Sequence, residues 1–223
     1  TTRDRLHDYI EIDNTLLELI DTAGIRRQLS KANRLEQQSV EQSLGALEEI
    51  DVAILVVDAA DEPTWQEQHL GGLITEAQTA CVVLLNKADL IPSDQRKNII
   101  KKLGRFLPML SFASILWVSA KDGEGVNKII PEAKMAAADW GKTLDSKELV
   151  RFFNFLKKTK TTSKLPLKQL EQIDTKPPRF LLHLKTKENP PWAIGQWVET
   201  KLRQFYNFKG TPVKVRLMGT RKN

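Results

Sequence analysis

The chain has 223 residues, 41% of them hydrophobic, which is enough to bury one large core or two smaller ones. No run approaches the roughly 20 apolar residues that a membrane-spanning helix needs, and the first residues, TTRDRLHDYIEID, have the pattern of neither a secretory signal nor a transit peptide. The single cysteine, Cys81, excludes a disulfide framework. Its apolar surroundings favour a buried core residue in a reducing compartment.

Charge is distributed unevenly along the chain. Residues 1–144 contain 16 Lys and Arg against 22 Asp and Glu, a net −6, whereas residues 145–223 contain 18 against 6, a net +12. A basic segment of this size is typical of a surface that meets nucleic acid, although solvated lysines would give the same count.

The first 143 residues alternate between strand and helix patterns. Residues 9–13 and 15–21 predict a β-hairpin that turns at Asn14. Apolar runs predict buried strands, and apolar residues at helical spacing predict helices; the strands are 51–59, 80–90 and 114–120, and the helices are 39–50, 65–77, 95–107 and 125–140. This order predicts an α/β fold, a doubly wound and largely parallel sheet with helices on both faces.

The remaining residues predict a small α+β region. A helix is expected over SKELVRFFNFLK (146–157), and the basic run KKTKTTSK (157–164) follows it and suits either a nucleic-acid contact or a solvated loop. The stretch 192–208 predicts a second helix, whose apolar residues favour a core role: Trp192, Ile194, Trp197, Leu202, Phe205 and Phe208.

Three apolar strands end in polar turns: DTAG (21–24), NKAD (86–89) and SAKDG (119–123). Each turn alone could be a simple loop or helix cap. Ligands bind outside the carboxyl ends of strands in open α/β sheets, so the three turns together, in this order, indicate one binding site.

These turns resemble the third, fourth and fifth signature motifs of guanine-nucleotide-binding G domains, and TTRD (1–4) resembles the switch segment that contributes the second. The string TTRD followed by DTAGIRR resembles the bacterial Der (EngA) GTPases, which carry two tandem G domains and a C-terminal KH-like domain. KPPRFLLHL (176–184), a helix up to Phe208 and FKGTPVKVRLM (208–218) resemble the strand, helix and final strand of that last domain. The resemblance implies a P-loop-NTPase-type G domain over 1–143 and a KH-like domain over 144–223.

The resemblance implies that the chain binds GTP or GDP with Mg²⁺. Asp21 and Thr2 would hold the metal, and Gly24 would bring its N–H to the γ-phosphate. Asp89 would accept the N1 and 2-amino hydrogens of guanine, which adenine cannot offer. The implied nucleotide-binding residues are Asp21, Thr22, Ala23, Gly24, Ile25, Asn86, Lys87, Ala88, Asp89, Ser119, Ala120 and Lys121.

Roles at the base follow from the same resemblance. Asn86 would meet the purine N7 edge or brace the loops, and Lys87 would lay its stem over the base plane. The N–H of Ala120 would reach the guanine O6. The catalytic group is not assigned.

Two departures from the family pattern affect the phosphate side. No G-x-x-x-x-G-K-[ST] phosphate loop occurs in the sequence. Its strand would lie between the 15–21 and 51–59 strands, so we expect Thr1 to begin a fragment, with an upstream G domain and P-loop segment as its partner, and we expect weak GTP binding by these residues alone. Ile25 stands where many GTPases carry a water-orienting glutamine, and the resemblance suggests K⁺ as a substitute helper.

The functional hypothesis is a GTP-hydrolysing factor in assembly of the large ribosomal subunit, in a bacterial cytoplasm or an organelle stroma or matrix. The ribosomal role comes from the resemblance alone. No GXXG loop of an RNA-gripping KH domain is present after residue 145. The net charge of +12 nevertheless favours ribosomal RNA contacts, for which the candidates are Lys157, Lys158, Lys160, Lys164, Arg216 and Arg221. The alternative is a non-hydrolysing RNA- or protein-binding module on a degenerate G domain.

Overall fold

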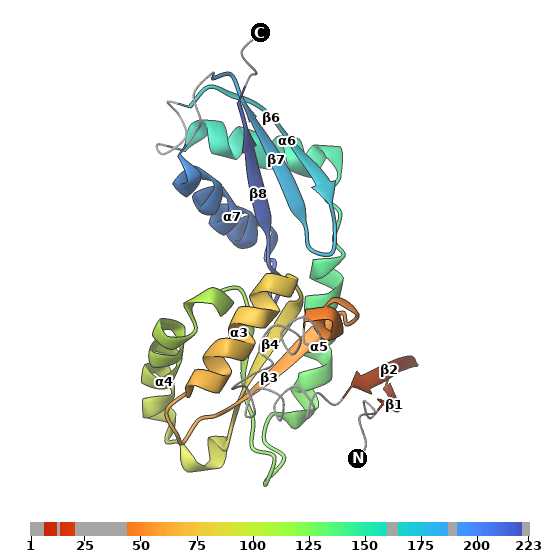
Figure 1. Cartoon of the computed structure of the whole chain (residues 1–223), viewed down its shortest axis with the longest axis vertical. Coiled ribbons are helices and arrows are strands. Elements are labelled where there is room, and N and C mark those ends of the chain that lie inside the picture. Colours follow the sequence, from red (N-terminus) through yellow and green to blue (C-terminus); the bar gives the residue numbers. More distant parts are fainter. Residues whose placement is uncertain (1–6, 13, 21–43, 160–164, 187–190, 220–223) are drawn as a thin grey trace, which may run out of the picture. The chain divides into compact units, whose positions relative to one another are not determined.

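The chain falls into two units by its internal contacts, residues 1–46 and 47–223. The computed structural model describes residues 7–12, 14–20, 44–159, 165–186 and 191–219 (Figure 1). The predicted helix over 39–50 therefore lies partly outside the described residues.

The first unit contains the predicted hairpin. Strand β1 (His7–Ile12) pairs antiparallel with β2 (Thr15–Ile20), from Ile12 opposite Thr15 to His7 opposite Ile20. Asn14 lies in the turn with φ of 56°, a left-handed conformation that asparagine tolerates better than most residues. The hairpin prediction is confirmed, and the two strands form a sheet of their own.

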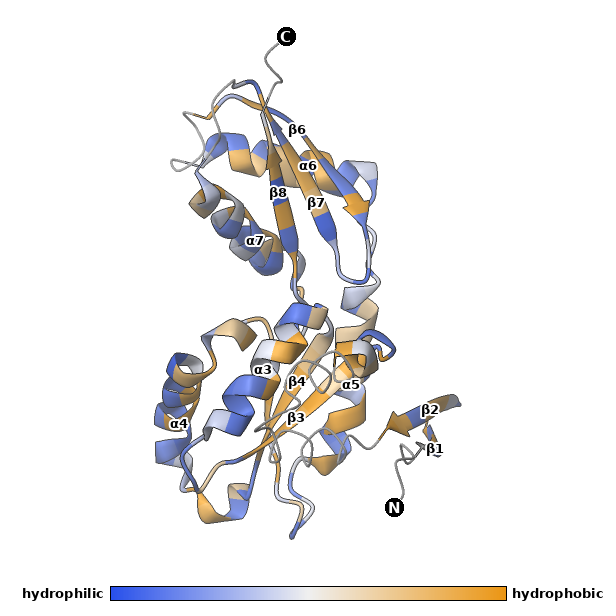
Figure 2. Ribbon diagram, viewed as in Figure 1, coloured by the Kyte–Doolittle hydropathy of each residue, from blue (hydrophilic) through white to orange (hydrophobic). Residues whose placement is uncertain are grey.

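The second unit begins with a parallel sheet in the order β3-β4-β5. Its strands are β3 (Val52–Asp58), β4 (Ala80–Asn86) and β5 (Ser114–Trp117). Every residue of β4 from Ala80 to Leu85 is buried, because a central strand covered on both faces has no solvent side. The three strand predictions are confirmed, and Figure 2 shows β3 and β4 as largely hydrophobic ribbons.

Helices cover both faces of this sheet. Helix α5 (Ile129–Trp140) packs Ala136 and Trp140 against Val82 and Leu84. Helix α3 (Trp65–Ala77) packs on β3. Successive side chains of a strand point to opposite faces of the sheet, and the buried residues of β3 lie on the face away from α5. They are Ala53, Leu55 and Val57. Helix α4 (Ser93–Phe106) precedes β5.

The C-terminal part, residues 144–223, forms a second sheet in the order β6-β7-β8. Its elements are α6 (Ser146–Lys158), β6 (Leu167–Asp174), β7 (Arg179–Leu184), α7 (Trp192–Tyr206) and β8 (Lys214–Met218). Strands β6 and β7 are antiparallel, and β7 and β8 are parallel. Both helices bury residues in one core with the sheet, including Phe152 and Leu156 of α6 and Val198 and Leu202 of α7.

Strand β6 has no counterpart among the sequence predictions. It is an edge strand in which only Leu170 is buried. Its pairing with β7 shifts register between Leu167 and Gln169 and again between Gln172 and Asp174. These irregularities interrupt the alternation of apolar and polar residues by which a strand is recognised.

The junction segment, residues 209–211, joins the C-terminal part to the sheet β3-β4-β5. The N–H of Cys81 donates to the carbonyl of Gly210 at 2.7 Å, and the N–H of Gly210 donates to the carbonyl of Phe112 at 3.0 Å. Thr211 is fully buried and donates its hydroxyl to the carbonyl of Ala136. The junction segment thus binds the amino-terminal edge of the sheet β3-β4-β5 through buried backbone groups.

Gly210 is required at this point for two reasons. Its φ is +67°, a conformation that other L residues rarely adopt. A Cβ built on it would lie 2.7 Å from the Cβ of Ala136 and 3.2 Å from the carbonyl oxygen of Cys81. No side chain fits there without movement of the backbone.

Cys81, the single cysteine, lies in the buried strand β4. Cys81 is fully buried, and burial raises the pKa of its thiol to about 12, as expected of a core residue. Within the described ranges, the structure contains no helix with the length and apolar character required to cross a bilayer.

Candidate functional site

The carboxyl end of β4 leads directly into the NKAD turn. Asn86 ends the strand, Lys87 adopts a left-handed conformation with φ of 64°, and a short 3₁₀ helix, η1 (Ala88–Leu90), follows. Ala88 is buried, and its N–H donates to the carbonyl of Val118 at 3.0 Å. This bond fixes the turn against the segment that follows β5.

The second turn, SAKDG (119–123), follows β5 and closes on itself. Ser119 is fully buried, and its N–H donates to the carbonyl of Glu124. Gly125 follows with φ of 72°, and a Cβ on it would lie 2.2 Å from the carbonyl oxygen of Trp117. Only glycine lets the chain pass so close to the end of β5.

The two turns are joined by side-chain hydrogen bonds. Ser119 donates its hydroxyl to Oδ1 of Asp89 at 2.8 Å, and the N–H of Ala120 donates to Oδ1 of Asn86 at 3.0 Å. The N–H of Asp122 donates in turn to the Ser119 hydroxyl. Residues 30 and 34 positions apart in sequence are thus brought together at one edge of the sheet.

This geometry suits the recognition of a planar base with two adjacent donors. Asp89 is exposed, and the hydroxyl of Ser119 fixes the orientation of its carboxylate. The side chain of Asn86 accepts the N–H of Ala120 and so links the two turns. Because the N–H of Ala120 already donates to Asn86, a guanine O6 would have to share or replace that bond.

Lys87 forms an ion pair that the sequence analysis did not anticipate. Its ammonium group contacts the carboxylate of Asp58, the last residue of β3. Desolvation would raise the pKa of Asp58, but hydrogen bonds from Lys87 and from the N–H of Ala60 outweigh it and lower the pKa. The hydrogen bond and charge of Asp58 raise the pKa of Lys87.

Arg96 of α4 also links the two turns and was missed. Its guanidinium donates to the carbonyl of Ala88 at 3.1 Å and to the carboxylate of Glu124 at 2.9 Å, and it lies 5.1 Å from the centre of the Trp117 ring. A basic helix gives no sign of which of its cations faces inward. Asp58 could have been noticed, since it ends an apolar strand with a carboxylate as Asp21 does.

The phosphate and metal side of the predicted site lies outside the described residues. This applies to Thr2 and to Asp21, Thr22, Ala23, Gly24 and Ile25. Within the described part of the chain, no cluster of three or more His, Cys, Asp or Glu side chains could hold a metal ion. Lys121 is described and exposed.

The predicted RNA-facing residues do not form one surface. Lys157 and Lys158 are exposed at the end of α6. Arg216 is exposed on β8 between Val215 and Leu217, which pack toward the helices, so it lies on the opposite face of the sheet. Lys160, Lys164 and Arg221 lie outside the described residues.

Comparison with known families identifies both parts of the chain. Residues 2–158 match the model of the elongation factor Tu GTP binding domain. The chain belongs to this family. Residues 147–217 match the KH-domain-like model of the C-terminal region of EngA bacterial GTPase enzymes, so the G-domain fold is followed by a KH-like domain, as predicted. The two matches overlap on α6, and the boundary at 143/144 stays a prediction.

Curated relatives of this G-domain chain are named GTPase Der, which confirms the resemblance to the Der (EngA) family. The relative from Clostridium novyi is 33% identical over 222 residues, covering 96% of this chain and 51% of its own length. The one from Geobacter metallireducens is 30% identical, covering 98% and 52%. The chain therefore spans about half the length of the curated relatives it matches.

Solved structures give weaker matches. Elongation factor SelB from Methanococcus maripaludis, in complex with the GTP analogue GppNHp, is 18% identical with a TM-score of 0.48, covering 78% of this chain and 34% of its own. Era in complex with MgGDPNP and nucleotides 1506–1542 of 16S ribosomal RNA is 19% identical with a TM-score of 0.46, covering 100% and 82%. The family assignment does not depend on either structure.

Proposed function

We propose that this chain supplies the guanine-reading and RNA-facing half of a GTP-driven assembly factor for the large ribosomal subunit. The single observation that carries the nucleotide part is the bonded pair of turns, in which Ser119 holds Asp89 and Asn86 holds the Ala120 amide. A carboxylate held this way matches the two adjacent donors of guanine, and adenine would leave it unpaired.

Discrimination at such a site is expected to be strong. Once a base lies against Asp89 it excludes water from the carboxylate, so a base without the matching donors leaves that carboxylate both desolvated and unpaired. The proposed substrate is therefore GTP, and its product GDP would be held by the same turns.

The proposed metal ligands are Thr2 and Asp21, because hard cations such as Mg²⁺ prefer oxygen donors of this kind. Mg²⁺ would neutralise charge on the β- and γ-phosphates. Since Ile25 cannot orient a water molecule, we also propose K⁺ as a second cation near the phosphates.

The ribosomal part of the proposal is supported by the family and by charge. The relatives named GTPase Der come from bacteria, and the KH-like domain carries most of a net +12. A basic domain of this kind binds phosphate backbones. The bacterial sources of the relatives and the buried thiol of Cys81 support a reducing compartment such as the cytoplasm.

A second candidate function is a module that binds RNA or protein without hydrolysing GTP. The observation that favours it is the net charge of +12 on residues 145–223, which attracts phosphate backbones whether or not a nucleotide is bound. The first candidate requires the turns to select guanine, whereas the second does not.

Saturation-transfer NMR with nucleosides tests base selection independently of any phosphate contact. The chain should give a saturation signal with guanosine and little with adenosine. In the Asp89→Asn variant, guanosine should lose its signal and xanthosine should gain one, because an amide donor meets the 2-oxo group.

Asp94→Asn is the matched control, since Asp94 is an exposed acid in the first turn of α4 and its loss changes the net charge equally. It should leave the preference for guanosine unchanged. Equal signals from guanosine and adenosine in the unmodified chain would contradict guanine recognition and favour the second candidate.

A further inference from the structure

A shallow groove of about 800 Å³ runs along α6 on the KH-like domain. It is formed mainly by one side of α6 and is completed by Phe205 of α7. The lining residues are Ser146, Lys147, Val150, Arg151, Asn154, Phe155, Lys158 and Phe205. Figure 2 shows hydrophilic and hydrophobic bands alternating along this helix.

The charged residues of the groove form a single stripe. Lys147, Arg151 and Lys158 are spaced by four and then seven residues, so they lie on one side of the helix and extend over about 16 Å. All three are exposed. Among the described residues that line the groove, none is acidic.

The floor of the groove is aromatic. The rings of Phe155 and Phe205 lie 5.3 Å apart between centroids, and the guanidinium of Arg151 lies 5.4 Å from the centroid of Phe205. Beside them Val150 is 58% exposed and extends the apolar surface of the groove. The groove therefore offers π-faces and an apolar surface next to a row of cations.

We propose that this groove binds a single-stranded segment of RNA, with phosphates along Lys147, Arg151 and Lys158 and a base against Phe155 and the Arg151 guanidinium. The proposal rests on the proposed function and assigns its RNA contact to one surface. This surface is not the one predicted from the sequence. Only Lys158 belongs both to the groove and to the predicted RNA contacts.

Charge complementarity selects this occupant. The groove is lined by three cations and no acid, and the two acids beside Lys147, Asp145 and Glu148, accept each other's backbone N–H in the helix cap. This balance suits a polyanion, and stacking on aromatic or guanidinium planes is the usual way that proteins hold unpaired bases. Double-stranded RNA keeps its bases stacked inside and would leave Phe155 and Val150 without a contact. A peptide helix would need a longer apolar stripe than these residues provide.

Fluorescence anisotropy with the full 223-residue chain tests the proposal. The probe is a fluorescein-labelled oligouridylate of about 12 nucleotides, compared with a duplex of the same length. Neutralising the stripe with Lys147→Gln, Arg151→Gln and Lys158→Gln should weaken binding of the single strand about tenfold or more. The slope of log K against log salt should fall by about two units, because each phosphate contact to a single strand contributes about 0.7.

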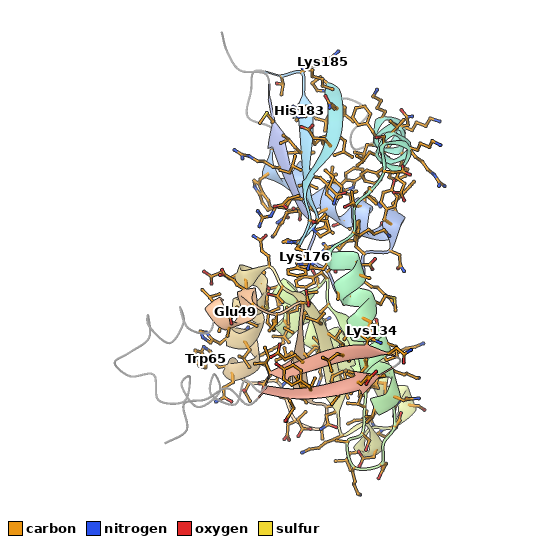
Figure 3. All side chains as sticks on the ribbon, turned by 90° about the vertical axis from the view of Figure 1, so that its right-hand side faces the viewer. Glu49, Trp65, Lys134, Lys176, His183 and Lys185 are labelled. Carbon is orange, nitrogen blue, oxygen red and sulfur yellow. The ribbon has the colours of Figure 1, made fainter. Side chains whose placement is uncertain are left out.

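The matched control removes three exposed cations from the sheet of the same domain. Lys168→Gln, Lys185→Gln and Lys214→Gln lower the net charge equally; Lys185 is labelled in Figure 3, beyond His183 at the end of β7. This variant should weaken binding less than about threefold, because it removes only a share of the general positive field and no direct contact with the strand.

Phe155→Leu tests the stacking contribution separately. It keeps an apolar side chain in the core while removing the π-face, and it should weaken binding about fivefold with an unchanged salt slope. Thermal unfolding followed by circular dichroism checks that the variant folds. If it does not fold, the charge variant remains a complete test because none of its three residues belongs to the core.

The outcomes separate this inference from the proposed function. If the unmodified chain binds neither probe, the RNA part of the proposed function fails. If it binds RNA but the stripe and sheet variants weaken it equally, the groove assignment is overturned. Tighter binding of the duplex, or displacement of the single strand by polyglutamate at equal charge concentration, would also overturn it.

Discussion

The two edges of the sheet β3-β4-β5 are built from different kinds of contact. At the carboxyl edge, the contacts that join the NKAD and SAKDG turns are mainly side-chain bonds between exposed or half-buried groups, such as Asn86 with Ala120 and Arg96 with Glu124. At the amino edge, Gly210 is held by two backbone bonds to Cys81 and Phe112, and Thr211 adds a buried hydroxyl bond to the Ala136 carbonyl. The first edge can exchange partners with a ligand, whereas the second is suited to permanent attachment.

Strand β4 connects the two edges. The same strand, β4, carries Asn86 at one end and Cys81 at the other. Because the bond from Cys81 to Gly210 is buried, the KH-like domain is expected to move together with the sheet. A nucleotide-dependent change would then reposition both together rather than bend the chain at residues 209–211.

The largest expected effect is at the junction segment. Gly210→Ala places a methyl group 2.7 Å from the Cβ of Ala136 and forces a positive φ on alanine. We expect a loss of about 3 kcal/mol or more in the free energy of unfolding, measured by urea denaturation.

Gly104→Ala is the control for that substitution. Gly104 is exposed in α4, and a Cβ there meets no atom within 4 Å. Alanine should stabilise the helix by up to about 1 kcal/mol. A similar small effect at Gly210 would show that the amino edge is not rigid.

An intermediate effect is expected at the carboxyl edge, on binding rather than on folding. Arg96→Met removes the bonds to Ala88 and Glu124 while keeping an apolar stem over Trp117. Guanosine affinity should fall about tenfold, because charged hydrogen bonds of this kind contribute roughly 1.5 kcal/mol or more. Nucleoside titration by saturation-transfer NMR measures it.

Two further variants define the role of Arg96. Lys97→Met, on the exposed side of the same helix, should leave guanosine affinity unchanged. Arg96→Lys should restore only part of it, because an ammonium cannot span two acceptors as a guanidinium does. An Arg96→Met variant that binds guanosine normally would exclude this residue from positioning the turns.

The two edges also differed in how well the sequence revealed them. The apolar runs predicted β3, β4 and β5 and placed both turns at their carboxyl ends, since burial on both faces leaves a continuous pattern. The bonds from Ser119 to Asp89 and from Ala120 to Asn86 follow once those strands are adjacent.

The amino edge could not be predicted in the same way. The contact of Gly210 with Cys81 joins backbone groups, and no side-chain pattern encodes it. Arg96 is one of several cations on α4, and its inward direction depends on where α4 packs. Of the aromatic floor of the α6 groove, Phe205 was interpreted as core and Phe155 was given no role, and both are packed against the core while remaining partly exposed.

The smallest expected effect is on the pH dependence of stability, for which each edge supplies one carboxylate. Asp139 of α5 accepts a hydrogen bond from the N–H of Lys209 at the amino edge. Desolvation raises its pKa from 3.8, against the opposing influence of the Lys209 N–H and of Lys142. The native state therefore holds the proton of Asp139 more tightly than the unfolded chain does, and the contribution of Asp139 to stability declines as pH rises through this raised pKa.

Asp58 at the carboxyl edge behaves in the opposite way. Its pKa lies below 3.8 because Lys87 and the Ala60 N–H outweigh desolvation, so its stabilisation is present at neutral pH and is lost as pH falls through the lowered pKa. Relative to the unmodified chain, Asp139→Asn should gain stability between about pH 3 and pH 7, and Asp58→Asn should lose it, each by about 1 kcal/mol or less. Urea midpoints at several pH values measure both trends. Parallel trends would mean that the two carboxylates have similar surroundings, and the contrast between an exchangeable edge and a buried one would not extend to their charges.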